Sequence, residues 1–171
     1  MKTKRAALAA FLLVTAASAA TAERKPMALG DYAESMRTEL KNGAVRLYTD
    51  VMKLSDSEAK VFWPLYHAYE KERSKLGDQR IELVSQFAEI QATGTPNNEQ
   101  AAALAKKWFG LQDARLNLWK KYHKDIAKAL SPTRAAQFVQ IEYDIALVID
   151  LGVAARMPLI GTPGEITAPS P

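Results

Sequence analysis

A heptad pattern, in which an apolar residue recurs every seven positions, constrains this chain more than any other feature of its sequence. The repeat consists of Phe62, Tyr69, Leu76, Leu83 and Ile90. Because about seven residues make two helical turns, these side chains form one stripe along a helix. The stripe predicts a helix over about residues 55–90 that packs lengthwise against another helix.

The start of this helix is marked by Ser55-Asp56-Ser57-Glu58, which has the pattern of a capping box. The serine oxygen can accept a hydrogen bond from the amide of Glu58, whose carboxylate can accept one from the amide of Ser55. Pro64 lacks the amide that would bond to the Lys60 carbonyl, which predicts a kink near Trp63. Since the apolar stripe continues past the proline, we expect the helix to continue too.

A second helix of matching length follows a short loop. Residues 91–98 have a loop composition, and within them Thr95 is predicted to cap a helix whose first residue is Pro96. This helix, over about residues 96–130, has apolar residues at helical spacing: Leu104, Trp108, Leu111, Leu118, Tyr122 and Ile126. Two long helices joined by a short loop predict an antiparallel hairpin.

Shorter helices are predicted on either side of the hairpin, so the predicted fold class is all-α. The first covers about residues 31–52, and a break at Asn42-Gly43 is an open alternative. The last covers about residues 132–155 and begins at the Ser131-Pro132 cap. It is apolar around much of its circumference, through Phe138, Val139, Ile141, Ile145, Leu147, Val148, Ile149 and Leu151. That pattern predicts burial on more than one side, in the core or in a dimer interface.

The N-terminus reads as a secretory signal peptide over residues 1–22. A basic start precedes an apolar run over residues 6–17, which is shorter than the roughly 20 residues that span a bilayer as a helix. Small residues at Ala20-Thr21-Ala22 predict cleavage after Ala22, with cleavage after Ala19 and an uncleaved amphipathic anchor as alternatives. We therefore expect a periplasmic protein.

The remaining chain divides into three parts. Residues 23–30 are predicted to be a flexible leader, residues 31–157 a single helical domain, and residues 158–171 a disordered tail rich in proline and glycine.

Composition excludes several classes of function. The chain has no cysteine, which rules out disulfides, thiolate metal sites and cysteine nucleophiles. Its net charge is +4, and loss of Lys2, Lys4 and Arg5 with the signal peptide reduces it to +1. Net charge therefore gives no argument for nucleic-acid binding.

Candidates for catalysis and metal binding are few. His67 and His123 are the only histidines, and neither belongs to a recognisable catalytic motif, so a non-enzymatic protein without a cofactor is predicted. A metal site is an alternative. His67 and Glu70 lie three residues apart, the hairpin could bring His123 near them, and Glu70 or Asp125 could be a third ligand. The competing interpretation places both histidines on solvated helix surfaces.

A binding surface is the stronger candidate, because the chain has more aromatic residues than one seam between two helices can bury. The aromatic candidates are Trp63, Tyr66, Trp108 and Trp119. Lys120, Lys124 and Lys128 form a basic stripe on the same hairpin. Together they suit unfolded or acidic clients, although lysines near a helix C-terminus also stabilise that end on their own.

Two motifs carry a resemblance to a known family. Leu54-Ser55-Asp56-Ser57-Glu58 and Leu130-Ser131-Pro132-Thr133-Arg134 resemble the paired LTxxQ motifs of the Spy and CpxP family of periplasmic stress proteins, which includes zinc-resistance and heavy-metal-sensor relatives. In both motifs Ser stands in place of Thr, and Glu58 or Arg134 stands in place of the final Gln.

The resemblance implies a small all-α homodimer shaped as a curved cradle. Its basic and apolar concave face would bind unfolded clients without ATP, or a periplasmic sensor domain. Metal-binding members use histidine-rich segments, which this chain lacks.

The prediction is therefore a non-enzymatic periplasmic protein, chaperone-like or an envelope-stress adaptor, that forms a homodimer. We expect no nucleic-acid partner and no stable membrane insertion after signal cleavage. A heavy-metal sensor or scavenger and a structural partner of an envelope complex remain the alternatives.

Overall fold

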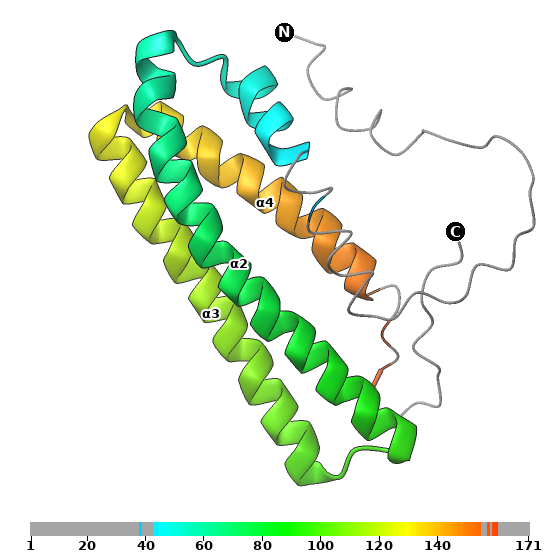
Figure 1. The fold of residues 1–171 in the computed structure, drawn as a ribbon. Helices are drawn as coiled ribbons and strands as arrows, with labels where there is room; N and C mark the ends of the chain where they lie inside the picture. Colours follow the sequence, from blue (N-terminus) through cyan, green and yellow to red (C-terminus); the bar gives the residue numbers. More distant parts are fainter. Residues whose placement is uncertain (1–37, 39–42, 155–156, 158, 161–171) are drawn as a thin grey trace, which may run out of the picture.

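The computed structural model describes residues 38, 43–154, 157 and 159–160. These residues form helices and no strand (Figure 1). Three helices, α2 (Asp56–Thr93), α3 (Asn98–Ala129) and α4 (Pro132–Ala154), follow a helical segment over residues 43–52. We call that segment the N-terminal segment. The predicted all-α fold with a long helical hairpin is confirmed.

Figure 1 shows α2 and α3 running side by side in opposite directions, with α4 returning along them. The three helices begin and end within about three residues of the predicted bounds, a deviation expected at helix ends. The predicted signal peptide, the leader, the helix start at Asp31, Asn42 and most of the C-terminal tail lie outside the described residues.

The start of α2 confirms the predicted capping box. The amide of Ser55 donates to Glu58 Oε2 at 2.8 Å, and the amide of Glu58 donates to Ser55 Oγ at 3.3 Å. The helix then continues through Pro64, whose side chain is exposed. It ends at Gly94, where a φ of 138° lies in a region that side chains with a Cβ rarely adopt.

The start of α3 differs from the prediction, because Asn97 rather than Thr95 is the cap. The amide of Gln100 donates to Asn97 Oδ1 at 2.8 Å, and the amide of Asn97 donates to Gln100 Oε1 at 3.0 Å. Glutamine three residues after the cap can close this reciprocal pair, whereas a cap at Thr95 would have the shorter Asn98 there. Pro96 is therefore buried in the turn and is not the first helical residue.

The core lies where the N-terminal segment meets α2, α3 and α4, and it is dominated by aromatic rings. The Tyr48 ring packs edge-on against Tyr66 at 4.8 Å between centroids, and Tyr69 packs edge-on against Phe138 at 4.9 Å. The largest fully buried side chains are Tyr48, Met52, Phe62, Tyr66, Tyr69, Ile126, Phe138 and Glu142. They place the densest packing near the start of α2.

Within the described residues, the final helix is buried on one face, and its other face is exposed, as the predicted alternative of a dimer interface requires. Phe138, Ile141 and Ile145 are buried, whereas Leu147 and Leu151 on the opposite side are exposed. Within the described residues, the helices that cover α4 all pack on the same side of it.

Ion pairs hold α4 at both ends. Near its start, Arg134 Nε lies 2.8 Å from Glu58 Oε1 on α2. Near its end, Asp150 accepts from Arg80 of α2 at 2.7 Å and from Arg115 of α3 at 3.0 Å. The position of α4 along the hairpin is therefore fixed at two distant points.

Candidate functional site

A buried carboxylate, Glu142 on α4, lies at the centre of the core and is only 2% exposed. Its Oε1 accepts a hydrogen bond from the Tyr48 hydroxyl at 2.8 Å, and its Oε2 accepts one from the Tyr69 hydroxyl at 2.5 Å. The Arg73 guanidinium lies 3.6 Å from Oε2. Glu142 thus joins the N-terminal segment, α2 and α4, with its charge balanced and its oxygens hydrogen-bonded.

The tyrosines around Glu142 act as permanent hydrogen-bond donors. Burial, and then the negative charge of Glu142, raise the pKa of Tyr48 and of Tyr69 far above the usual range of tyrosine. Trp119 of α3 donates to the Tyr69 oxygen at 3.1 Å, which extends the network to a fourth element. This arrangement holds helices together.

Sequence reasoning missed Glu142, although a signal for it exists. It lies four residues after Phe138 and three before Ile145, so it is the acidic residue on the buried stripe of α4. A carboxylate at such a position needs donors, and tyrosines recur on the facing stripe of α2.

Tyr66 was predicted to contact a partner, and that prediction is wrong because its side chain is fully buried. It lies four residues after Phe62 and three before Tyr69, which places it on the core stripe of α2. Its hydroxyl has no hydrogen-bond partner, and burial raises the pKa of that hydroxyl.

The two motifs behind the family resemblance contact each other through their last residues. Arg134 Nε and Nη2 donate to the two carboxylate oxygens of Glu58 at 2.8 and 3.0 Å. Hydrogen bonds from Arg134 and then from Ser55 lower the pKa of Glu58 to about 2. Arg134 Nη1 also donates to the Met52 carbonyl at 2.5 Å. The opposite charges at equivalent motif positions were the sequence signal for this pair.

The other predicted partner-binding residues fall into two groups. Trp63 and Trp119 are half-buried against the core, through Phe62 and Tyr69 respectively. Trp108 is 51% exposed and packs edge-on against Phe109, itself 60% exposed, at 5.2 Å between ring centroids. Of the predicted aromatic residues, Trp108 is therefore the most available to a partner.

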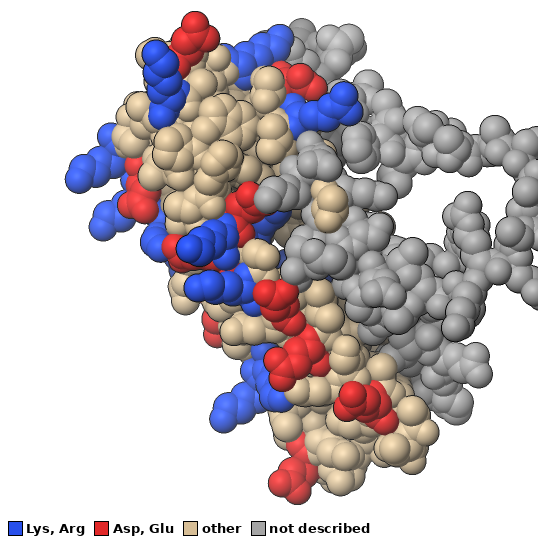
Figure 2. Space-filling view, viewed as in Figure 1, with Lys and Arg blue, Asp and Glu red and all other residues tan. Residues whose placement is uncertain are grey.

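The predicted lysines Lys120, Lys124 and Lys128 are exposed on the C-terminal half of α3. Figure 2 shows Lys and Arg side chains projecting from the edge of the molecule that this part of α3 forms. Asp and Glu side chains are more frequent near the end where α2 connects to α3. The basic stripe is thus present on the surface, several turns away from Trp108 along α3.

The exposed side of α4 carries an apolar surface, on the helix for which the sequence predicted the core or a dimer interface. Tyr143, Leu147 and Leu151 lie four residues apart and Val148 flanks them, and all four are about half exposed or more. We call these four residues the α4 outer face. Ala136 and Gln140 continue it toward the start of the helix, and the half-buried Asp144 lies within it, four residues after Gln140 and four before Val148.

The residues of the metal alternative do not form a ligand cluster. His67 and His123 are both exposed, and Glu70 is half-buried. Within the part of the chain that the structure describes, no three His, Cys, Asp or Glu side chains gather closely enough to hold a metal ion. The metal alternative gains no support from the geometry.

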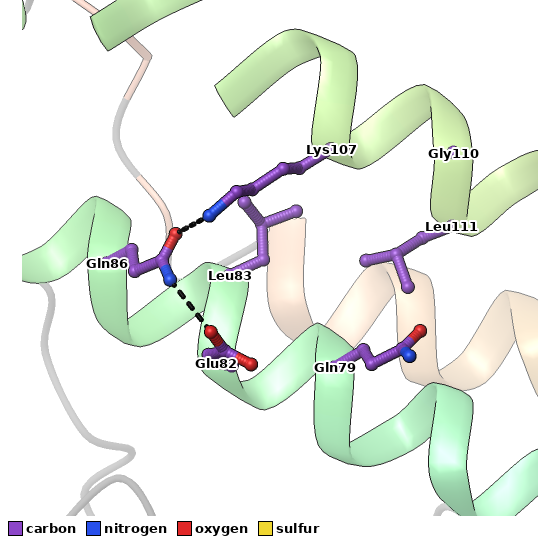
Figure 3. A pocket seen from close by; sticks show the side chains of 7 residues that line it. All are labelled: Gln79, Glu82, Leu83, Gln86, Lys107, Gly110 and Leu111. Carbon is purple, nitrogen blue, oxygen red and sulfur yellow. Dashed lines mark hydrogen bonds between the residues drawn. The ribbon is translucent and has the colours of Figure 1, made fainter. Parts of the chain in front are cut away.

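A shallow hollow of about 230 Å³ lies between the distal halves of α2 and α3 (Figure 3). Leu83 and Leu111 point into it, and Lys107 donates to Gln86 at 2.6 Å across it. Ligand pockets are usually larger, roughly 300–1,000 Å³, and more enclosed. We therefore assign no small-molecule ligand to this hollow.

No family model matches the chain, and neither curated proteins nor solved structures include a significant match to it. In the described residues, no helix is both long enough and apolar enough to cross a membrane.

Proposed function

We propose that this protein is a non-enzymatic, periplasmic binding protein that holds apolar segments of unfolded proteins without ATP. The observation that carries the proposal is the α4 outer face, an exposed apolar surface on a helix that ion pairs hold to α2 and α3 near both ends. Contiguous apolar patches on the surface of a protein often mark sites of interaction with other proteins.

The shape of the strip suits extended or helical apolar segments. Tyr143, Leu147 and Leu151 stand about 6 Å apart along the helix axis, at a rise of about 1.5 Å per residue. A mainly apolar strip can accept many apolar sequences, because apolar contacts impose no fixed register on them. Such tolerance is what a binder of unfolded chains requires.

The basic stripe on α3 adds a second, electrostatic component to the proposal. Lys120, Lys124 and Lys128 would attract acidic segments and increase their rate of encounter with the protein. The motif resemblance to periplasmic stress proteins and the predicted signal peptide agree with this function and supply the proposed location.

The same surface can also associate with a second copy of the chain. Two α4 outer faces packed in antiparallel fashion would bury Leu147 and Leu151 of each copy, which supports the proposed homodimer. In this arrangement dimer formation and client binding compete for one surface.

The test is a light-scattering assay with a urea-denatured model enzyme diluted into buffer. The protein at stoichiometric dose should suppress the aggregation of the enzyme. The double variant Leu147→Lys/Leu151→Lys should lose most of this effect, because two charges interrupt the strip. Leu116→Lys, which changes a residue 46% exposed on α3, is the matched control and should retain it.

Unchanged aggregation at a several-fold excess of the protein would contradict the proposal. If the double variant and Leu116→Lys lost the suppression of aggregation equally, the assignment of client binding to α4 would be contradicted.

A further inference from the structure

The outer edge of α3 combines an exposed pair of aromatic rings with exposed lysines. Trp108 is 51% exposed and Phe109 is 60% exposed, and the two rings pack edge-on at 5.2 Å between centroids. Lys106 is exposed just before this pair. Lys120 lies eleven residues after Phe109, and on nearly the same side of α3, because eleven residues make about three helical turns. We call this surface the α3 outer edge, which consists of Lys106, Trp108, Phe109 and the basic stripe of Lys120, Lys124 and Lys128.

The lysines of the α3 outer edge keep their charge available to a partner. The neighbouring cations Arg115 and Lys121 are held by carboxylates of α4 and α2. Among the residues that the structure places, by contrast, no carboxylate lies within ion-pair distance of Lys106 or of the basic stripe. Asp113 is the one exposed acidic residue of α3 between Lys106 and Lys128. The edge is therefore net positive.

The α3 outer edge is long and straight. It lies along one unbroken helix, and Trp108 and Lys128 are about 30 Å apart along the axis at 1.5 Å per residue. The hollow between α2 and α3 is lined by other residues of α3, among them Leu111, and neither aromatic ring of the edge lines it. The two rings thus project from the helix into solvent (Figure 2 shows lysines projecting from the same edge).

Aromatic rings flanked by lysines match the chemistry of an anionic bilayer surface. Tryptophan is favoured at the boundary between headgroups and acyl chains, where its ring meets apolar groups and its N–H meets water. Each lysine close to anionic headgroups strengthens binding about fivefold. A helix with this composition lies in the plane of the membrane surface.

The length of the edge favours a bilayer over a protein partner. A bilayer surface is continuous, so the rings and all the lysines can engage it at once. A protein partner would need acidic groups at matching intervals over about 30 Å. Aromatic residues that anchor protein interfaces also insert into well-packed pockets of the partner, around which the remaining contacts exclude water.

We propose that the α3 outer edge binds the anionic surface of a lipid bilayer, with α3 parallel to the membrane plane. Trp108 and Phe109 enter the headgroup region, and Lys106 and the basic stripe contact lipid phosphates. The basic stripe also serves the proposed binding of clients, but the α4 outer face belongs to a different helix. This inference therefore goes beyond the proposed function.

The test is co-sedimentation of the exported protein with vesicles of equal parts phosphatidylcholine and phosphatidylglycerol. Vesicles of phosphatidylcholine alone are the comparison. The wild type should bind the anionic vesicles at least about tenfold more tightly, and this binding should weaken as added salt screens the lysines. Equal affinity for both kinds of vesicle would overturn the inference.

Charge reversal locates the electrostatic contact. Lys120→Glu/Lys124→Glu should lower the affinity for anionic vesicles at least about twentyfold, at about fivefold for each lysine. The matched control is Lys71→Glu/Lys75→Glu, which reverses two exposed lysines that also lie four residues apart, on α2. It should lower the affinity less than about threefold, because charges away from the contact are screened. Equal losses would overturn the inference, since binding would then follow net charge alone.

Removal of the rings tests the apolar contact. Trp108→Ser/Phe109→Ser should lower the affinity for anionic vesicles at least about tenfold. Both rings are at least half exposed, so the fold should persist, which an unchanged far-ultraviolet circular dichroism spectrum checks. Val61→Ser, at a residue 40% exposed on α2, is the control and should bind like the wild type. Unchanged affinity of the double serine variant would overturn the inference.

Tryptophan fluorescence identifies the ring that enters the headgroup region. Anionic vesicles should shift the emission of the wild type to shorter wavelengths, because Trp108 leaves water. Trp108→Phe should bind the vesicles without this shift, and a shift that persists in Trp108→Phe would overturn the inference.

An acidic protein partner is the competing occupant of the edge. Binding of the wild type to polyglutamate, without binding to anionic vesicles, would overturn the inference in favour of such a partner. Because no unfolded client is present in these experiments, failure here and failure of the aggregation assay are separate results.

Discussion

Glu142 is the residue whose loss should cost the most stability. Its replacement by alanine leaves the Tyr48 and Tyr69 hydroxyls without an acceptor and Arg73 without its partner. We expect Glu142→Ala to lower the free energy of unfolding by about 3–5 kcal/mol in urea titrations. Glu142→Gln, which keeps an acceptor oxygen, should cost less. A loss below about 1 kcal/mol in the alanine variant would show that the network is dispensable.

Because of Glu58, the free energy of unfolding should depend on pH in the acid range. Its pKa is about 2 in the folded protein, against an ordinary value of 4.5, chiefly because of the hydrogen bonds from Arg134. The folded state therefore gains stability above pH 4.5, and this gain is lost as the pH falls toward 2.

The comparison that isolates this effect is between the wild type and Glu58→Gln. The difference between their urea midpoints should shrink as the pH is lowered from 4.5 to about 2. A difference that stays constant over this range would contradict the role of the Glu58 charge.

At the scale of elements, the connection between the N-terminal segment and α2 can be tested by glycine substitution. Lys53→Gly removes the cost of a positive φ and should stabilise the packed N-terminal segment by up to about 1 kcal/mol, measured as slower amide hydrogen exchange of residues 43–52. Lys75→Gly, at an exposed position inside α2, should instead cost about 1 kcal/mol. Similar effects of both substitutions would contradict the strain at Lys53.

Element boundaries were the part of the fold that sequence reasoning predicted best, because caps are local. The start of α2 is set by reciprocal hydrogen bonds between Ser55 and Glu58, which lie within four residues of each other. The error at Thr95 has the same origin, since a better local pair, Asn97 with Gln100, begins two residues later.

Exposure was predicted less well, because it depends on which neighbours cover each side chain. Tyr66 and Trp108 are both aromatic residues on amphipathic helices, yet one is buried and the other half exposed. The same limit applies to α4, where Ile145 and Leu147 look equivalent in the sequence and lie on opposite faces. The α4 outer face and the burial of Tyr48 follow from the packing of four elements, which no local pattern encodes.

At the scale of the whole molecule, the α4 outer face predicts self-association. We expect sedimentation velocity to show a concentration-dependent dimer of the wild type, and a monomer for Leu147→Lys, which places a charge at the centre of the interface. A denatured client should shift the wild type toward smaller species, because it competes for the same face. A dimer that persists in Leu147→Lys would place the interface elsewhere.

The ion pairs at the two ends of α4 have a consequence for the energetics of recognition. With Arg134 bound to Glu58 at one end and Asp150 bound by Arg80 and Arg115 at the other, the helix is preorganised before any ligand arrives. A ligand on its outer face then loses its own conformational entropy, while the protein loses little. Affinity along that face should therefore follow the stiffness and apolar area of the ligand, with a negative heat-capacity change as its calorimetric signature.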